Sequence, residues 1–336
     1  MATGAATGMG TLFASRLVLG AGESAGFPTA TTAMSRWLPA SLRGMGQGVV
    51  HFASRLGSAL TPIMVGAIIA ISSGRVSFFV LGAVSLIWAV VWAVYFRDGP
   101  QDHDRVGADE LEELRDGDAA QGRSTPTPWR ALVPALLPVA IVDFCYGWLL
   151  WVYITWLPTV FQSSFGLDVT TYALYTSLVL VAGAVGDLAG GQLADALMVR
   201  CRSMRTARRL PLVIGLGGSI VALLPALFVH ELLPVTISLA AAYFLLELTN
   251  STLWALPMDM APEHAGAASG FMNTGYGLAG SLSPLVFGIL LGATGGNWRI
   301  PLLVSIGLLL VGVVVSLRID PRRRVAAPPS GQELPV

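Results

Sequence analysis

Long apolar runs alternate with short polar connections along most of the chain. A helix needs about 20 mostly apolar residues to cross the hydrocarbon core of a bilayer. Runs of that kind lie near 11–37, 44–72, 75–96, 132–160, 170–198, 208–230, 232–258, 265–292 and 299–318. The pattern therefore predicts an all-α membrane protein with nine transmembrane helices.

Two polar segments interrupt this pattern. Residues 97–130 are rich in Asp, Glu, Arg, Gly, Pro and Thr, and 109–115 within them is predicted as a short surface helix. The chain after 318 carries an arginine cluster and then proline-rich residues, which we expect to be disordered. The predicted organisation is a three-span remnant of an N-terminal helical half at 1–96, a cytoplasmic loop at 97–130, a six-span C-terminal half at 131–318 and a cytoplasmic tail at 319–336.

Composition supports a membrane protein and excludes several other classes. Hydrophobic residues make up 54% of the 336 positions and charged residues 12%, and the mean hydropathy is +0.68. A soluble domain carries about 25% charged residues, so most of this surface is expected to face lipid. The formal net charge of zero argues against an electrostatic nucleic-acid binder.

Motifs of enzymes and metal sites are missing from the sequence. Cys145 and Cys201 show neither the number nor the spacing of a disulfide framework or a metal site. No HExxH, Walker or GxSxG motif occurs, and no nucleophile–base constellation can be assembled. We therefore expect a protein that is not an enzyme and that uses neither a cofactor nor a metal.

The arginines predict how the spans are oriented. Cytoplasmic connections carry an excess of basic residues. The connections 97–130 and 199–209 and the tail are arginine-rich, whereas 161–169 and 230–231 contain no arginine. One consistent arrangement places the arginine-rich connections and the C-terminus in the cytoplasm, which predicts a multi-pass protein of the inner (plasma) membrane.

An internal repeat relates the first three predicted spans to the last three. The following positions match when the chain is shifted against itself: Gly44, Gly48, Leu56, Leu60, Pro62 and Gly66 fall on Gly266, Gly270, Leu278, Leu282, Pro284 and Gly288. Many transporters are built from such repeats, with the substrate site where the repeats meet. We interpret the chain as a carrier of two six-helix halves that lacks its first three helices through a truncated or misassigned start, and as given it is expected not to transport. A natural nine-helix carrier is the alternative.

Several short motifs follow one another in the order known from a transporter family. They are Arg16–Glu23 (RLVLGAGE), Gly26–Pro28, Trp37–Pro39, Phe144–Gly147, Thr155–Pro158, Gly190–Asp195, Trp254–Asp259 and Ser269–Asn273. Together they resemble the anion:cation symporter branch of the major facilitator superfamily, which includes carriers for hexuronates, galactonate and glucarate. The resemblance covers nearly the whole chain and implies the equivalents of helices 4 to 12 of a twelve-helix carrier.

The sequence also departs from that family. The family's first helix, which carries substrate-binding and proton-linked residues, has no counterpart, and neither does the loop signature after the second helix. The repeat copy of that loop signature is present and ends at Asp195, which is followed by Ala196 where the family often has a basic residue. His51 stands where the family usually has Asn, whereas the repeat partner Asn273 keeps it.

Glu23 and Arg16 are charged residues inside the first predicted span. Charges at the centre of a span cost at least ~2.5–3.5 kcal/mol, so they usually face a cavity. Their spacing puts both on one helix face, two turns apart. The resemblance assigns Glu23 to proton coupling and makes Arg16 a substrate-binding candidate. The alternative is a structural ion pair between them.

Arg55 lies in the middle of the second predicted span, and His51 lies one turn before it on the same face. A guanidinium group binds a carboxylate through two parallel hydrogen bonds. We therefore predict Arg55 as the anchor for an organic anion and His51 as a donor or titrating group beside it. The alternatives are a helix-packing role or an acid that pairs with Arg55.

Further candidates line the later spans. Tyr146 and Asn273 can hydrogen-bond hydroxyl groups, and Trp151 and Trp254 offer flat rings to a substrate, although aromatic residues in membranes are more often packing residues or interface anchors. Asp143 and Glu247 are intramembrane acids for which the sequence shows no partner. Either one can bind protons or form a half-buried ion pair.

Asp195 is predicted, by the resemblance, to form a gating contact on the cytoplasmic face. The alternative is a solvated helix end. Taken together, the sequence predicts a secondary active transporter, a proton-coupled symporter of a small organic anion such as a sugar acid, acting as a monomer in the lipid bilayer without nucleic acid. The alternatives are a facilitator or exporter of another small solute, or a non-functional fragment of such a carrier.

Overall fold

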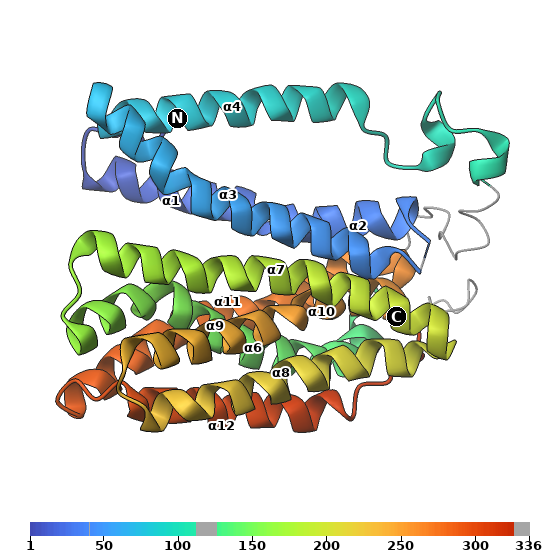
Figure 1. The fold of residues 1–336 in the computed structure, drawn as a ribbon. Helices are drawn as coiled ribbons and strands as arrows, with labels where there is room; N and C mark the ends of the chain where they lie inside the picture. The colour runs from blue at the N-terminus through green and yellow to red at the C-terminus, as the bar shows by residue number, and fades with distance from the viewer. Residues whose placement is uncertain (40, 112–125, 326–336) are drawn as a thin grey trace, which may run out of the picture.

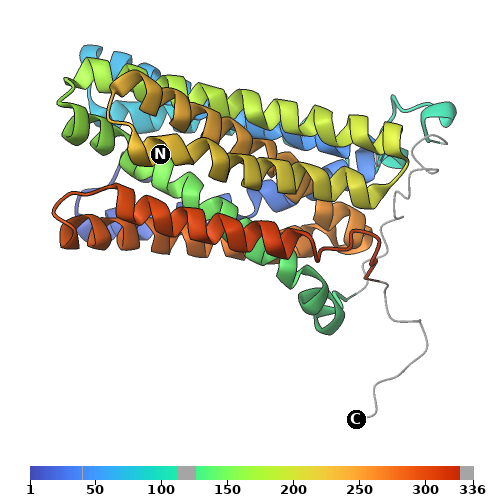
Figure 2. The same ribbon diagram turned by 60° about the horizontal axis from the view of Figure 1, so that its bottom comes forward.

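The structure, a computed structural model, describes residues 1–39, 41–111 and 126–325, and this part of the chain is helical without strands. The elements in chain order are α1 (Met9–Ser24), α2 (Gly26–Trp37), α3 (Arg43–Ile71), α4 (Gly74–Tyr95), the short 3-10 helix η1 (Pro100–Asp102), α6 (Trp129–Phe165), α7 (Val169–Cys201), α8 (Met204–Phe228), α9 (Leu232–Leu248), α10 (Asn250–Met260), the 3-10 helix η2 (Pro262–His264), α11 (Ala265–Ala293) and α12 (Arg299–Ser316). The long helices run side by side along a common direction in both views (Figures 1 and 2).

The protein is a multi-pass membrane protein. Within the described residues, seven helices are long and apolar enough to cross a membrane, with α9 and α10 counted as one span, Leu232–Met260. The two predicted spans outside this set are those at 11–37 and 44–72. The first is divided into α1 and α2, of 16 and 12 residues, which are each shorter than a membrane span. The second, α3, carries Arg43, Gln47, His51 and Arg55.

The interruption between α1 and α2 follows from a proline. Pro28 has no N–H to donate, and its ring collides with the carbonyl group four residues earlier, that of Ser24. The α1 helix ends at that residue, and Ala25 separates the two helices. A second interruption, at Thr249, divides α9 from α10 within a polar stretch that reaches Thr252. Both interruptions lie inside spans that the sequence predicts as continuous.

The helices from α6 to α12 form the buried bundle of the molecule. The α6 helix runs through its middle, with 72% of its most apolar window buried, and packs against α11 and α12. The α7, α8 and α9 helices complete the bundle, with α9 lying between α7 and α8 in the packing. In contrast, α4 lies at the outer edge (Figure 1), and the most apolar window of this helix is only 6% buried.

The first helices pack against this bundle through α2 and α3. The α3 helix lies along α7, and α2 lies against α11. Gly44 permits a close approach: a Cβ atom there would lie 2.6 Å from Asp195 Oδ1 and 3.1 Å from the Gly191 carbonyl oxygen. At the repeat-related position, a Cβ on Gly266 would lie 2.5 Å from Thr32 Oγ1 of α2. The first turns of the two repeat-related helices are therefore tightly packed, that of α3 against α7 and that of α11 against α2.

The polar segments are described only in part. The loop after α4 contains η1, whereas most of the predicted surface helix at 109–115 and the proline-rich end of the tail lie outside the described residues. The tail up to Val325 folds back onto the end of the bundle. Its Val325 N–H donates to the Met260 carbonyl oxygen at 2.8 Å. The Arg209 side chain donates to the Ile319 carbonyl oxygen at 2.5 Å. We call this end of the bundle, where α3 begins, the Arg43 end.

Candidate functional site

Arg55 of α3 forms a charged cluster with two acids of the bundle. Its Nη2 atom lies 3.0 Å from Glu247 Oε1 and 3.2 Å from Glu247 Oε2. Its Nε atom lies 3.6 Å from Asp187 Oδ2. Both carboxyl side chains are fully buried, whereas the Arg55 side chain is 19% exposed. Of these three side chains, that of Arg55 is therefore the one that is not fully buried.

Hydrogen bonds fix the two acids in place. The Tyr146 hydroxyl of α6 donates to Glu247 Oε2 at 2.7 Å and accepts a hydrogen bond from Arg55 Nη2 at 3.1 Å. The Asn250 amide donates to Asp187 Oδ1 at 2.8 Å. The cluster thus joins α3 to α6, α7, α9 and α10. An organic anion that binds Arg55 here has to compete with carboxylates already present.

An aromatic group lies next to this cluster. The His51 ring stacks on Phe27 of α2, with the ring centroids 4.9 Å apart and the planes inclined by 11°, and its centroid lies 5.4 Å from that of Trp254 of α10. The His51 side chain is buried, and its Nε2 atom has no hydrogen-bond partner among the described residues. Because His51 lies one turn before Arg55, an unused imidazole nitrogen and flat rings adjoin the guanidinium group.

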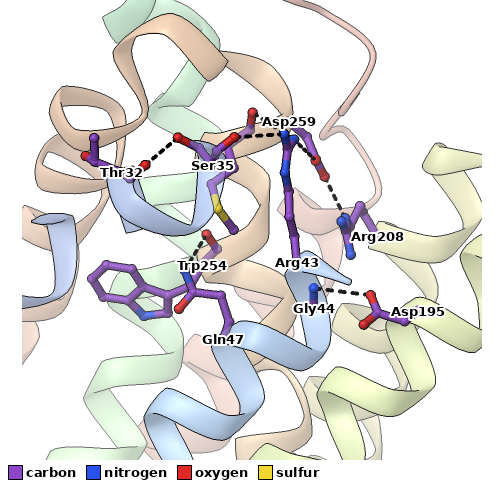
Figure 3. A network of polar contacts seen from close by, with 10 residues as sticks. Thr32, Ser35, Arg43, Gly44, Gln47, Asp195, Arg208, Trp254 and Asp259 are labelled. Carbon is purple, nitrogen blue, oxygen red and sulfur yellow. Dashed lines mark hydrogen bonds and ion pairs between the residues drawn. The ribbon is translucent and has the colours of Figure 1, made fainter. Parts of the chain in front are cut away.

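A second network closes the Arg43 end of the bundle (Figure 3). Asp259 of α10 lies between two arginines, 3.3 Å from Arg43 Nη1 and 2.7 Å from Arg208 Nε. All three side chains are buried. Arg43 also donates to the Ser35 carbonyl oxygen of α2 at 3.3 Å. The network therefore ties α2 and α3 to α8 and α10.

Asp195 belongs to the same end of the bundle and contacts the beginning of α3 (Figure 3). Its carboxylate accepts hydrogen bonds from the backbone N–H groups of Gly44 at 3.2 Å and Met45 at 2.6 Å. These N–H groups have no partner within the helix, and they carry the positive end of the helix dipole. The Asp195 side chain thus holds the first turn of α3 against the end of α7.

The structure brings four of the predicted binding residues together. Arg55 and Tyr146 are hydrogen-bonded, and Trp254 lies against His51, one turn away from Arg55. Asn273 is half-buried on α11. Trp151 lies against Tyr276 of α11, with the ring centroids 5.6 Å apart, and Tyr276 in turn stacks on Tyr146.

Glu23 and Arg16 lie apart from this cluster. Both are exposed on α1, and among the described residues they form no ion pair with each other. Arg16 instead lies over the ring of Phe78 of α4, 5.7 Å from its centroid. A Cβ atom added at Gly20, Gly22 or Gly26 would meet nothing within 4 Å. The α1 face that carries Glu23 is therefore open.

Several residues of these networks are not among the sequence-predicted site residues. They are Phe27, Arg43, Asp187, Arg208, Asn250 and Asp259. Asp187 had a detectable signal, because it is an acid inside a predicted span, as Asp143 and Glu247 are. Asp259 was visible only as part of a motif, and Arg208 only as part of an arginine-rich connection. Their pairing depends on helix packing.

The comparisons with known proteins identify what the chain resembles. The model of the family described as the Major Facilitator Superfamily matches residues 1–284 and 203–335. Among curated proteins, the chain is 46% identical to the Probable sulfoacetate transporter of Cupriavidus necator, over 93% of this chain and 73% of the relative.

More distant relatives are also named as transporters. The chain is 27% identical to the Hexuronate transporter of Bacillus subtilis, over 86% of this chain and 68% of the relative. It is 26% identical to the chloroplastic Ascorbate transporter of Arabidopsis thaliana, over 92% of this chain and 57% of the relative. The chain thus spans between about half and three quarters of the length of these relatives.

Proposed function

We propose that this chain, which belongs to the Major Facilitator Superfamily, moves a small organic anion across a membrane by symport with protons. The family and the relatives indicate a transporter rather than an enzyme. One observation carries the choice of an anion: Arg55, part-way along a helix, keeps 19% of its side chain exposed within an otherwise buried polar cluster. A guanidinium group placed in this way suits a carboxylate or sulfonate.

The relatives narrow the class of substrate that we propose. They are named for sulfoacetate, hexuronate, galactonate and related acids, which share an anionic group on a small polar body. In our proposal the anionic group binds Arg55, and His51 and Tyr146 hydrogen-bond the rest of the molecule. Trp254 packs against its apolar side. Asn273 and Arg16 complete the site when the carrier rearranges, and Glu23 carries a transported proton.

We further propose the arrangement of the chain in the membrane. In addition to the seven apolar helices, α1 with α2 and α3 each form a span, which gives nine spans, equivalent to helices 4–12 of a twelve-helix carrier. Residues 1–96 belong to one helical half and 131–318 to the other, joined by the loop at 97–130 and followed by the tail at 319–336. The protein acts as a monomer.

The distribution of arginines supports one orientation. The connection between α7 and α8 and the tail after α12 both lie at the Arg43 end and are arginine-rich. Cytoplasmic connections carry such an excess. We therefore place the Arg43 end and the C-terminus in the cytoplasm and the protein in the inner (plasma) membrane. The Asp195 contact then lies on the cytoplasmic side, where it acts as a gate.

The proposed function is tested by the binding of two probes, sulfoacetate and D-glucuronate, to the purified chain in lipid nanodiscs. We expect the unmodified chain to bind at least one of them. The Arg55→Ala variant should bind about 10- to 100-fold more weakly, because hydrogen bonds to charged groups contribute ~1.5–3 kcal/mol. Isothermal titration calorimetry measures both affinities. The Arg97→Ala variant is the control, because Arg97 lies exposed in the loop after α4 and should leave binding unchanged.

Two results would contradict the proposal. One is an unmodified chain that binds neither probe. The other is an Arg55→Ala variant that retains full affinity, which would place the anion elsewhere. An Arg55→Lys variant refines the result, because lysine keeps the charge but cannot form two parallel hydrogen bonds. We expect it to bind with an affinity between those of the unmodified chain and Arg55→Ala.

The proposed gating role of Asp195 gives a separate prediction. Replacing Asp195 with Asn removes the negative charge at the first turn of α3, an interaction worth about 0.3–2 kcal/mol. The backbone N–H groups of Gly44 and Met45 should then exchange with deuterium about 2- to 30-fold faster, as measured by mass spectrometry. The matched control is Asp168→Asn, because Asp168 accepts the Thr171 N–H at the start of α7. Unchanged exchange at the start of α3 would contradict the gate.

A further inference from the structure

The cluster around Arg55 contains more acids than its single cation balances. One guanidinium group is paired with two carboxyl groups, those of Asp187 and Glu247. If both were ionised, the cluster would carry one uncompensated negative charge at a place where both acids are fully buried. An uncompensated buried charge costs several kcal/mol. The cluster reaches neutrality when one of the two carboxyl groups holds a proton.

Within the described residues, no other cation faces the two acids. In the described part of the chain, the ionisable side chains that interact with the two acids are Arg55 and three tyrosines, Tyr146 of α6, Tyr243 of α9 and Tyr276 of α11. Asn250 of α10 is neutral and donates to Asp187. His51 of α3 faces Arg55, so a charged imidazole there would be repelled by the guanidinium group. Arg55 is therefore the counter-ion for both acids.

The geometry also places the two acids close enough to act as a pair. Asp187 has one oxygen, and Glu247 both oxygens, within 3.6 Å of the same guanidinium group. Each acid also accepts a hydrogen bond from a neutral donor, Tyr146 at Glu247 Oε2 and Asn250 at Asp187 Oδ1. Because the neutral donor persists whether or not the acid is charged, either acid can hold the proton and keep that hydrogen bond.

We propose that Asp187 and Glu247 share one proton and that anion binding to Arg55 brings in a second. Before binding, the positive charge of Arg55 is balanced by one carboxylate, while the other acid is protonated. A substrate anion that takes Arg55 removes the counter-ion of that carboxylate, which then binds one proton from solution. The charges remain balanced: one negative group and one proton enter together. A carboxylate of the pair thus neutralises Arg55 in the empty protein, as the substrate anion does after it binds.

The coupling step rests on the proposed function, because it requires an anion that binds Arg55. The shared proton does not, since it concerns the empty protein. It is also separate from the proton proposed for Glu23, which lies exposed on α1. Two measurements therefore test the inference independently, one without substrate and one with it.

The first measurement is infrared difference spectroscopy of the substrate-free chain in nanodiscs, which detects the carbonyl stretch of protonated carboxyl groups. We expect Glu247→Gln and Asp187→Asn each to abolish the same signal, because either change leaves one acid for one cation. Arg55→Met should instead strengthen it, because both acids are then protonated. Asp143→Asn is the control. Asp143 is a buried acid of α6 that forms no ion pair among the described residues, and its replacement should leave the pair's signal in place.

These outcomes separate a shared proton from two independent acids. If only one of the two substitutions removes a signal, that acid alone is protonated and the proton is not shared. If neither does, both acids are ionised and the inference is wrong. Size-exclusion chromatography and circular dichroism confirm that each variant is folded. Glu247→Gln and Asp187→Asn each keep the size of the native side chain. Because there are two such variants, the conclusion does not depend on either one alone.

The second measurement is the number of protons taken up per anion bound, obtained by calorimetry of sulfoacetate and D-glucuronate binding in buffers with different ionisation enthalpies. The unmodified chain should take up about one proton for each anionic group bound at Arg55. Glu247→Gln and Asp187→Asn should each keep this uptake, because the remaining carboxylate still loses its counter-ion, whereas the double variant should lose most of it. Unchanged uptake in the double variant would overturn the coupling step. A chain that binds neither probe would refute the proposed function, while the infrared result still decides the shared proton.

Discussion

Replacing Asp259 with asparagine is expected to lower the free energy of unfolding by about 3–5 kcal/mol, because the change removes a carboxylate that is bound to two buried arginines. Arg43 and Arg208 would then face each other across a neutral side chain. The loss should appear as a marked decrease in the melting temperature of the detergent-solubilised protein, followed by tryptophan fluorescence.

The matched control for this prediction is Asp320→Asn. Asp320 also pairs with an arginine, Arg322, at 3.6 Å, but the two side chains are 46% and 62% exposed. Exposed pairs contribute about 0–1 kcal/mol, so this variant should melt close to the unmodified protein. Equal melting temperatures for Asp259→Asn and Asp320→Asn would show that the buried network contributes little to stability.

Replacing Glu23 with glutamine is expected to abolish accumulation of the anion driven by a pH gradient while exchange of the anion continues. Glutamine imitates the protonated acid, so the carrier can still bind and exchange substrate. It cannot release the proton, which the empty carrier must do before it resets. The comparison is between counterflow and gradient-driven uptake in proteoliposomes in which the unmodified carrier accumulates the anion.

The control for this prediction is Glu263→Gln, because Glu263 is an exposed acid of η2 at the Arg43 end. Both activities should survive in that variant. Full gradient-driven accumulation by Glu23→Gln would exclude Glu23 from coupling. A folded Glu23→Gln variant that is inactive in both assays would instead indicate a role in binding.

The sequence predicted the helical architecture because membrane spans leave a strong local signal. Apolar runs of sufficient length located α4, α6 to α8, α11 and α12 and the combined span of α9 and α10. The division of 11–37 was foreseeable from Pro28, whose effect on the preceding turn is local. The spans at 11–37 and 44–72 lie outside the seven found within the described residues, so they remain a proposal.

The candidate site was predictable residue by residue but not as a network. Arg55 and Glu247 could each be singled out, because charges within spans are costly. That they pair with each other could not be deduced, since 192 positions separate them and only the packing of α3 against the bundle joins them. The same holds for Asp259, which lies 216 positions from Arg43. A single sequence carries no signal for contacts of that range.

The two arginines of α3 fasten this helix at two levels. Arg43 is bound at the beginning of the helix and Arg55 part-way along it, about 18 Å apart at 1.5 Å per residue. If the Arg55 level serves as a pivot, a tilt of about 10° moves the beginning of α3 by roughly 3 Å. That movement equals the length of a hydrogen bond, so one small rotation breaks the contacts of Asp195 and Asp259 together. A small tilt about the Arg55 level would thus open the contacts at the Arg43 end together.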